Sequence, residues 1–199
     1  MKLYYAPGAC SLASHIALHE TGLPFEIDKV NAATKTTASG GDFMQANPKG
    51  YVPALRLDDG SILTEGAAVL QYIADQNPGS GLAPKAGTME RYRLQEWLTF
   101  IGTEIHKSFS PLFNKTASDE VKNYARNLLT KRMGYVETQL ANKPYLMGDS
   151  FTVADAYMFV VVNWSSHVGF DLGQFPKIKE YIARIAVRPS VQAAMKTEG

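Results

Sequence analysis

The sequence predicts an α/β unit built around a small mixed sheet, followed by an all-α helical bundle. Short β-like runs alternate with helical segments up to residue 76, whereas the chain beyond residue 88 is almost wholly helical in pattern. A stretch rich in turn-forming residues, 77–84, lies between them. The 199 residues, 45% of them hydrophobic, suffice for a buried core. We therefore expect a first domain over 1–80, a linker over 81–87 and a helical domain over 88–199.

The first domain begins with a β-α-β unit. Residues 2–6 form an apolar, aromatic strand that Pro7-Gly8 ends. Apolar residues at helical spacing predict a helix over 11–21, with Gly22 as its stop signal. Residues 25–30 alternate apolar and polar side chains, as a half-buried strand does.

A hairpin and a helix complete this domain. The strands 54–57 and 62–64 flank Asp58-Asp59-Gly60-Ser61, a sequence typical of a hairpin turn. A helix over 67–76 follows. The order β-α-β-(α)-β-β-α fits a small mixed sheet covered by helices, as in thioredoxin-like domains.

The second domain consists of long helices whose apolar residues recur at intervals of three and four. Such helices bury their apolar faces by packing antiparallel into a bundle. The predicted helices span 89–113, 119–140, 153–168, 176–187 and 190–196.

Charge and cysteine content exclude several classes of protein. The 20 basic and 19 acidic residues give a net charge of +1, which argues against nucleic-acid binding by bulk positive charge. The longest apolar run, 158–162, is far shorter than the ~20 residues that span a bilayer. The single cysteine cannot form an internal disulfide, which suits a reducing compartment. We expect a soluble cytoplasmic protein with no nucleic-acid or membrane partner.

Cys10 is the first candidate for chemistry. It follows the Pro7-Gly8 turn at the start of the first helix, where backbone N–H groups and the helix dipole stabilise a thiolate and lower its pKa. The alternative is a small buried apolar residue. Because position 13 is Ala, the chain lacks a dithiol motif, and any redox cycle would need a thiol from outside.

Two further segments could bind a ligand. If the bond before Pro53 is cis, it turns the backbone of Val52 outward toward a peptide-like ligand; the alternative is an ordinary edge-strand proline. At Thr64-Glu65-Gly66 a helix begins, so its N–H groups suit a carboxylate while Glu65 could take an ammonium group. The alternative there is helix capping by Thr64, with Glu65 placed on the dipole.

The helix over 89–113 carries a polar stripe. At about 100° per residue, Thr99, Thr103 and His106 gather on one side, with Lys107 at its margin. The stripe either faces solvent or faces a ligand. The opposite, apolar side comprises Leu94, Trp97, Leu98, Ile101 and Ile105.

Two more patterns have structural explanations. His15 and His19 lie four apart on a helix, but no third ligand is apparent, so we expect no metal. Thr152-Val153-Ala154-Asp155 is a capping box, which we assign to stability rather than to catalysis.

Taken together, Cys10 after the first strand, Val52-Pro53, Glu65 at a helix start and the all-helical second half resemble a cytosolic glutathione transferase. The likeness is to the bacterial beta class and covers essentially the whole chain. The segments that carry it are 1–11, 47–50, 63–66, 104–107, 151–157 and 188–191.

This resemblance implies a site for glutathione as co-substrate. The cysteine matching Cys10 contacts the glutathione sulfur and can form a mixed disulfide with it. Val52, held by a cis Pro53, pairs its backbone with the cysteinyl part. Glu65 and Gly66 hold the γ-glutamyl end, Gly66 through its backbone N–H because Ser often stands at this position in relatives.

The resemblance also implies residues beyond these. Lys35 matches a lysine that reaches the glycyl carboxylate. Besides Cys10, the implied catalytic residues are His106, which would hydrogen-bond or polarise near the sulfur, and Tyr5, which would lie near it. The polar stripe would face the ligand, with Lys107 adding positive potential. The remaining implied contacts are Thr99, which stands where relatives commonly have Asn, Thr103 and Glu104.

The activity implied is conjugation of the glutathione thiolate to small hydrophobic electrophiles, in detoxification or catabolism, by a homodimer. One alternative is a glutathione-dependent disulfide reductase, peroxidase or reductive dehalogenase that uses a Cys10 mixed disulfide. Another is a non-catalytic, transferase-like binding module. Several aromatic residues would line the electrophile pocket or belong to the core, with core expected for most of them: Phe109, Phe113, Trp164, His167 and Phe170.

Overall fold

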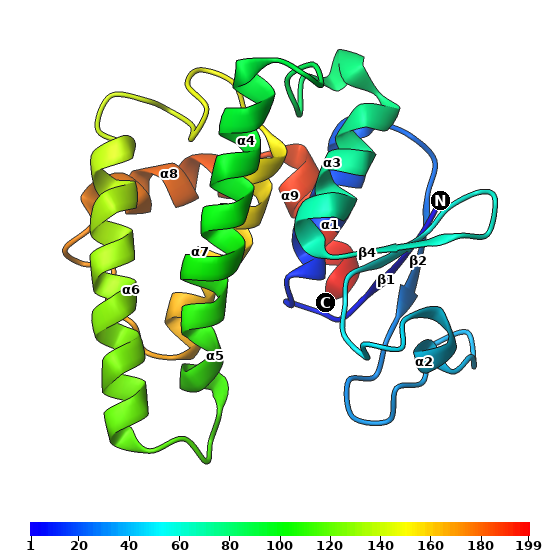
Figure 1. The fold of residues 1–199 in the computed structure, drawn as a ribbon, viewed down its shortest axis with the longest axis horizontal. Coiled ribbons are helices and arrows are strands. Elements are labelled where there is room, and N and C mark those ends of the chain that lie inside the picture. Colours follow the sequence, from blue (N-terminus) through cyan, green and yellow to red (C-terminus); the bar gives the residue numbers. More distant parts are fainter. The chain divides into compact units, whose positions relative to one another are not determined.

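The computed structural model describes residues 1–199 and divides into two compact units (Figure 1). The first unit combines Met1–Ala83 with Arg188–Gly199, and the second is Pro84–Val187. No helix combines the length and the apolar character needed to cross a membrane.

The first unit contains a four-stranded mixed sheet in the order β2-β1-β3-β4. Strand β1 (Lys2–Tyr5) pairs in parallel with β2 (Glu26–Lys29) and antiparallel with β3 (Ala54–Arg56), which pairs antiparallel with β4 (Ile62–Thr64). The thioredoxin-like order expected from the sequence is therefore confirmed, because β1, α1 and β2 form the crossover that parallel pairing requires.

Helices cover both faces of this sheet. Helices α1 (Ser11–Thr21) and α3 (Gly66–Gln76) pack against each other on one face. The other face buries Tyr4 against Phe43 of the short helix α2 (Phe43–Ala46), with ring centroids 5.6 Å apart. A 3₁₀ turn at Pro78–Ser80 lies in the turn-rich stretch 77–84, just before the linker predicted over 81–87.

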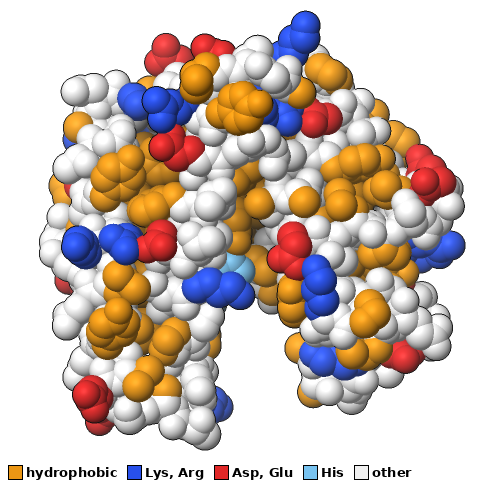
Figure 2. Space-filling model, in the orientation of Figure 1, with side chains coloured by type: hydrophobic (Ala, Val, Ile, Leu, Met, Phe, Trp, Pro, Cys, Tyr) orange, Lys and Arg blue, Asp and Glu red, His pale blue; other side chains and the backbone are white.

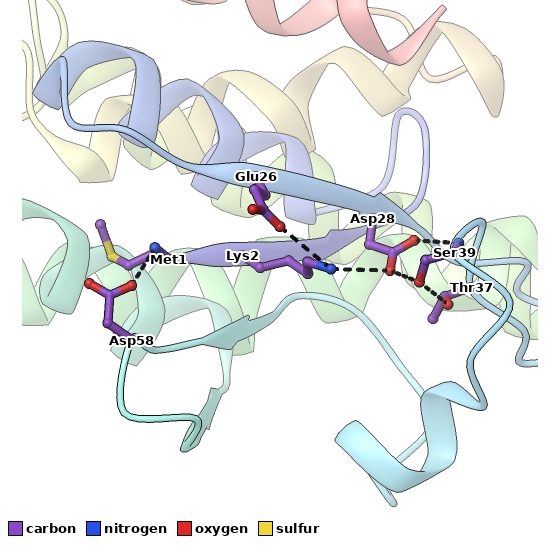
Figure 3. Close-up of polar contacts among 7 residues, drawn as sticks. All are labelled: Met1, Lys2, Glu26, Asp28, Thr37, Ser39 and Asp58. Carbon is purple, nitrogen blue, oxygen red and sulfur yellow. Dashed lines mark hydrogen bonds and ion pairs between the residues drawn. The ribbon is translucent and has the colours of Figure 1, made fainter.

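The β2 end of the sheet is tied to the loop that follows it (Figure 3). The buried carboxylate of Asp28 accepts hydrogen bonds from the backbone N–H and the hydroxyl of Ser39, at 3.1 and 2.5 Å. Lys2 extends its ammonium group to within 3.9 Å of Asp28 and 3.6 Å of Glu26. These contacts order the loop over 30–42, which carries Lys35.

The second unit is a helical bundle, as predicted. Its helices are α4 (Met89–Phe100), α5 (Lys107–Phe113), α6 (Asp119–Gln139), α7 (Val153–His167) and α8 (Pro176–Ala186). Helix α7 is buried continuously from Val153 to Val162, so it forms the centre of the bundle.

The predicted single helix over 89–113 is wrong in one respect. A π-helical segment, Ile101–His106, joins α4 to α5. Each π turn holds more residues than an α turn, so the rotation of 100° per residue fails across it. The apolar assignments for Leu94, Leu98, Ile101 and Ile105 hold, because all four are buried. Trp97 is only half-buried and contacts Phe100 and Tyr135 instead.

The expected division of the chain also needs a correction at its C-terminal end. Helix α9 (Pro189–Glu198) packs on α1 within the first unit rather than with the bundle. Val191 and Ala194 are fully buried, and Arg188 forms an ion pair with Glu20 of α1 at 2.7 Å. Apolar spacing identified the helix but could not identify its partner, since periodicity specifies a face and not what covers it.

Candidate functional site

Cys10 lies at the N-cap of α1, as the sequence predicts, and is partly exposed. Its Sγ lies 3.3 Å from the carbonyl oxygen of Val52, to which the thiol donates. The Val52-Pro53 peptide bond is cis. A thiol at the positive end of a helix dipole, beside the main-chain carbonyl of Val52, is suited to contact the sulfur of a peptide-like thiol.

The loop before Cys10 is fixed by a residue that the sequence did not single out. Glu198, at the end of α9, accepts a hydrogen bond from the backbone N–H of Gly8 at 3.0 Å. Its other oxygen lies 3.0 Å from Nδ1 of His15, and both side chains are almost fully buried. About 190 residues separate Gly8 from Glu198, so no local pattern could reveal the contact.

His15 and His19 are parts of this packing. Their rings stack with centroids 5.0 Å apart, and no group of three or more His, Cys, Asp or Glu side chains is arranged to hold a metal ion. Burial, and then the proximity of His15, lower the pKa of His19. The two histidines therefore act in the packing of α1.

Tyr5 is buried on the α1 side of β1, with its ring 6.0 Å from that of His15. Burial, followed by the charges of Glu198 and Asp28, raises the pKa of its phenol. Tyr5 therefore stays protonated at neutral pH and cannot serve as a phenolate base. The role that the resemblance implied for it is limited to that of a neutral group.

Glu65 has a strained backbone at the start of α3. Its φ and ψ are 71° and 118°, outside the regions that non-glycine residues favour, and its carbonyl accepts the N–H groups of Ala68 and Val69. Such strain persists where the surrounding structure imposes it and is concentrated at functional sites. The conformation leaves the carboxylate more than half exposed beside the N-terminus of the helix.

Two side chains contact this carboxylate, and the sequence predicts neither contact. The ammonium group of Lys49 lies 2.5 Å from Oε1 of Glu65, and the hydroxyl of Tyr51 donates to the same oxygen at 2.9 Å. The hydrogen bond to Glu65 is the main cause that raises the pKa of both Lys49 and Tyr51. In the sequence, the segment 47–50 is distinguished only by its resemblance to the transferase family.

A buried amide organises this turn. Nδ2 of Asn47 donates to the carbonyl of Tyr51 at 2.7 Å, and its Oδ1 accepts the N–H of Lys49 at 3.2 Å. Lys35, with φ of 59°, donates from Nζ to the carbonyl of Gly50 at 2.7 Å. The structure therefore connects Lys35 to the turn that leads into Val52.

His106 lies at the end of the π-helical segment, in the helical unit. Its Nδ1 is 2.7 Å from the hydroxyl of Tyr157, and its ring meets that of Trp164 edge-on at 4.8 Å. Burial, and to a lesser extent Lys107, lower the pKa of His106 to about 4. The imidazole is therefore neutral near pH 7 and is available as a hydrogen-bonding group, not as a cation.

The other predicted residues of this unit are more exposed. Thr103 donates to the carbonyl of Thr99 at 2.9 Å, and Glu104 forms an ion pair with Arg132 of α6 at 2.6 Å. Thr99, Thr103 and Lys107 are exposed, whereas His106, the remaining member of the predicted polar stripe, is partly buried.

Trp164 forms the centre of an aromatic cluster beside His106. Its ring contacts those of Phe109 and Phe113 edge-on, at 5.8 and 5.7 Å. Phe109 is fully buried, whereas Phe113 is half exposed. The cluster thus has a core side and a surface side. His167 is exposed and Phe170 is buried, so these two do not share one environment.

We expect the burial of His106 to be measurable as a lowered pKa of its imidazole. The imidazole of the folded protein should titrate near pH 4, and Trp164→Ala should raise that pKa toward 6.5 by admitting water. Since the unfolded chain titrates near 6.5, it binds more protons between pH 6.5 and 4, so the free energy of unfolding should fall as pH falls through that window. Proton NMR of the imidazole would measure this; a wild-type pKa above 6 contradicts it.

The thioredoxin-like unit thus presents a thiol at a helix N-terminus, a cis Val52-Pro53 bond and the exposed carboxylate of Glu65, groups that suit a thiol-containing peptide. Two family models match: "Glutathione S-transferase, N-terminal domain" over residues 8–76 and "Glutathione S-transferase, C-terminal domain" over 100–189. The chain is 45% identical to glutathione S-transferase GstA of Escherichia coli O157:H7 over 199 residues, covering 100% of this chain and 99% of that protein.

Solved structures give the same result. A ternary complex of BphK, a bacterial transferase, superposes with a TM-score of 0.99 at 56% identity, covering 100% of both chains. A sphingomonad transferase complexed with glutathione gives 0.97 at 49%, covering 100% and 99%. The bacterial beta-class enzyme of Sphingomonas chungbukensis gives 0.96 at 51%, with the same coverage. The chain belongs to the glutathione S-transferase family, with structural neighbours in the bacterial beta class. It is a transferase that uses glutathione as co-substrate.

Proposed function

We propose that the enzyme joins glutathione to small hydrophobic electrophiles and that the first unit holds the peptide through Cys10, Val52 and Glu65. The observation that carries the proposal is the placement of these three groups on one unit. Main-chain groups of Val52 pair with the cysteinyl part, beside the cis Pro53. Glu65 takes the γ-glutamyl ammonium, and the N–H of Gly66 at the start of α3 takes its carboxylate. Lys35 reaches the glycyl carboxylate.

The helical unit supplies the remaining groups. Neutral His106 donates a hydrogen bond that stabilises the thiolate without adding charge, while Lys107 adds positive potential. Thr99, Thr103 and Glu104 add polar contacts, and the exposed side of the Trp164 cluster binds the electrophile. The thiolate attacks the electrophilic carbon, the leaving group departs with the bonding electrons, and the thiol proton passes to solvent.

A second activity is favoured by the partial exposure of Cys10. Its thiolate can attack the disulfide of oxidised glutathione, forming a mixed disulfide and releasing one glutathione thiolate. Unlike conjugation, this reaction requires the sulfur of Cys10. Comparison of the two reactions in one variant therefore separates them.

We also propose that the protein is a cytoplasmic homodimer. Helix α4 carries Met89 and Tyr92, both more than half exposed, and a cavity of about 770 Å³ lies between other residues of α4 and those of α6. Figure 2 shows hydrophobic side chains interspersed with acidic and basic ones over the surface in view. The aromatic residues that line the cavity are Trp97, Phe100 and Tyr135. An exposed apolar face of this kind fits a second copy of the chain.

The activity is tested with glutathione and an activated chloroarene, using wild type and Cys10→Ala. We expect the variant to keep conjugation within about tenfold of wild type, since His106 and main-chain donors still stabilise the thiolate, and to lose disulfide exchange. Light scattering of the same samples should give about twice the chain mass of 21.8 kDa. Absence of conjugation by folded wild type would contradict the proposed reaction, and a monomer would contradict the dimer.

A further inference from the structure

The carboxylate proposed to hold the substrate ammonium already holds an ammonium group of the protein. Lys49 Nζ lies 2.5 Å from Oε1 of Glu65 and 3.0 Å from Oγ1 of Thr64. The pair is solvent-exposed, with 46% and 57% of the two side chains accessible. Surface pairs of this kind contribute little to stability, so this contact is better explained by binding than by folding.

The position of Lys49 is set by the turn from which it projects. Asn47, 1% exposed, fixes the N–H of Lys49 and the carbonyl of Tyr51. The backbone of the turn is therefore ordered, whereas the long side chain of Lys49 can change partner by rotation about its own bonds. The ammonium group of Lys49 therefore stays within reach of Glu65 whether or not the site holds a ligand.

Binding of a substrate ammonium at Glu65 brings two positive charges to one carboxylate. Two like charges at hydrogen-bonding distance from the same oxygen repel each other, and more strongly near a protein surface than in bulk water. The γ-glutamyl group carries its carboxylate on the same carbon as its ammonium. Lys49 can therefore leave Glu65 for that carboxylate, so that one ion pair is exchanged for two.

We propose that Lys49 is a specificity-determining residue that makes the site select a zwitterionic α-amino acid group. This inference rests on the proposed glutathione site at Glu65. A ligand with both charges is matched by Glu65 and Lys49, whereas a ligand with the ammonium alone is repelled by Lys49 or displaces it into water. Tyr51, which contacts the same Glu65 oxygen without a charge, cannot make this distinction.

The test is a comparison of two ligands on four proteins by calorimetry. The ligands are glutathione and its analogue with 4-aminobutyrate in place of the γ-glutamyl group, which keeps the amine and lacks the α-carboxylate. The proteins are wild type, Lys49→Gln, Tyr51→Phe and Lys29→Gln. Tyr51→Phe removes an uncharged donor to Glu65, and Lys29→Gln removes an exposed positive charge on β2.

We expect Lys49→Gln to weaken glutathione binding by roughly 3- to 10-fold and to leave the analogue unchanged or bound more tightly. Tyr51→Phe should change the affinity for both ligands by the same factor, and Lys29→Gln should change the affinity for neither. Equal effects of Lys49→Gln on the two ligands, or no effect on either, would overturn the inference while the glutathione site stands. If folded wild type fails to bind glutathione, the proposed site itself fails.

Discussion

Glu65→Gly is expected to weaken glutathione binding by at least about 10- to 100-fold while leaving the folded protein as stable as wild type or more stable. The binding loss follows from removal of a charge-assisted contact to the substrate ammonium, which is worth about 1.5–3 kcal/mol. Stability changes in the opposite direction because glycine adopts a φ of 71° without the strain that Glu65 experiences there.

The size of the stability change follows from two opposing terms. Relief of the strain contributes about 1–3 kcal/mol, and the greater freedom of glycine in the unfolded chain costs about 0.5–1 kcal/mol. The lost pair with exposed Lys49 adds little. Urea unfolding should therefore show an unchanged or slightly larger free energy of unfolding.

The matched control is Glu65→Gln, which removes the charge but keeps a side chain at the strained position. We expect it to weaken glutathione binding without raising stability. If Glu65→Gly instead lowers the free energy of unfolding by more than about 1 kcal/mol, the backbone at this position is not a source of strain.

Asp155→Ala should lower the free energy of unfolding by roughly 3–5 kcal/mol. Asp155 is fully buried at the start of α7, the central helix of the bundle. One carboxylate oxygen accepts the N–H of Leu146 at 2.8 Å and the hydroxyl of Tyr181 at 2.9 Å. The other accepts the N–H and the hydroxyl of Thr152, at 2.8 and 2.9 Å. Alanine would leave these buried donors without acceptors.

The N-cap of α4, which makes a single hydrogen bond, provides the comparison for the loss of stability in Asp155→Ala. Thr88 caps α4 by accepting the N–H of Arg91 at 3.3 Å in a partly buried setting, and this single cap bond means that Thr88→Ala should cost only about 1 kcal/mol. Chemical denaturation of both variants measures the difference. Similar losses in the two variants would mean that the network around Asp155 acts only as a helix cap.

Much of the fold was predictable because its signals are local. The Gly22 stop after α1, the turn between β3 and β4 and the capping box of α7 each concern neighbours in sequence, and the structure confirms all three elements. The prediction of one helix over 89–113 is wrong because it assumes one fixed rotation per residue, which a π-helical segment does not keep.

The site was predictable only in part, for the same reason. Cys10, Val52 and Glu65 each lie at a recognisable start of a helix or strand, so sequence position indicated them. The contacts of Lys49 and Tyr51 with Glu65 span about 15 residues across the β3–β4 hairpin, and that of Glu198 with Gly8 spans nearly the whole chain. No periodicity encodes such contacts, because tertiary packing alone creates them.

The packing of α9 on α1 has a consequence for the order in which the protein acquires its structure during synthesis. The helical unit is continuous in sequence, so all of its residues have been made before Arg188–Gly199 is translated. The first unit, although its strands are made earliest, cannot place Glu198 beneath the Cys10 loop until that segment leaves the ribosome. The usual order of domain completion, N-terminal first, is thereby reversed. A chain that ends at residue 187 contains the whole sequence of the helical unit but lacks the segment that completes the thiol-bearing unit.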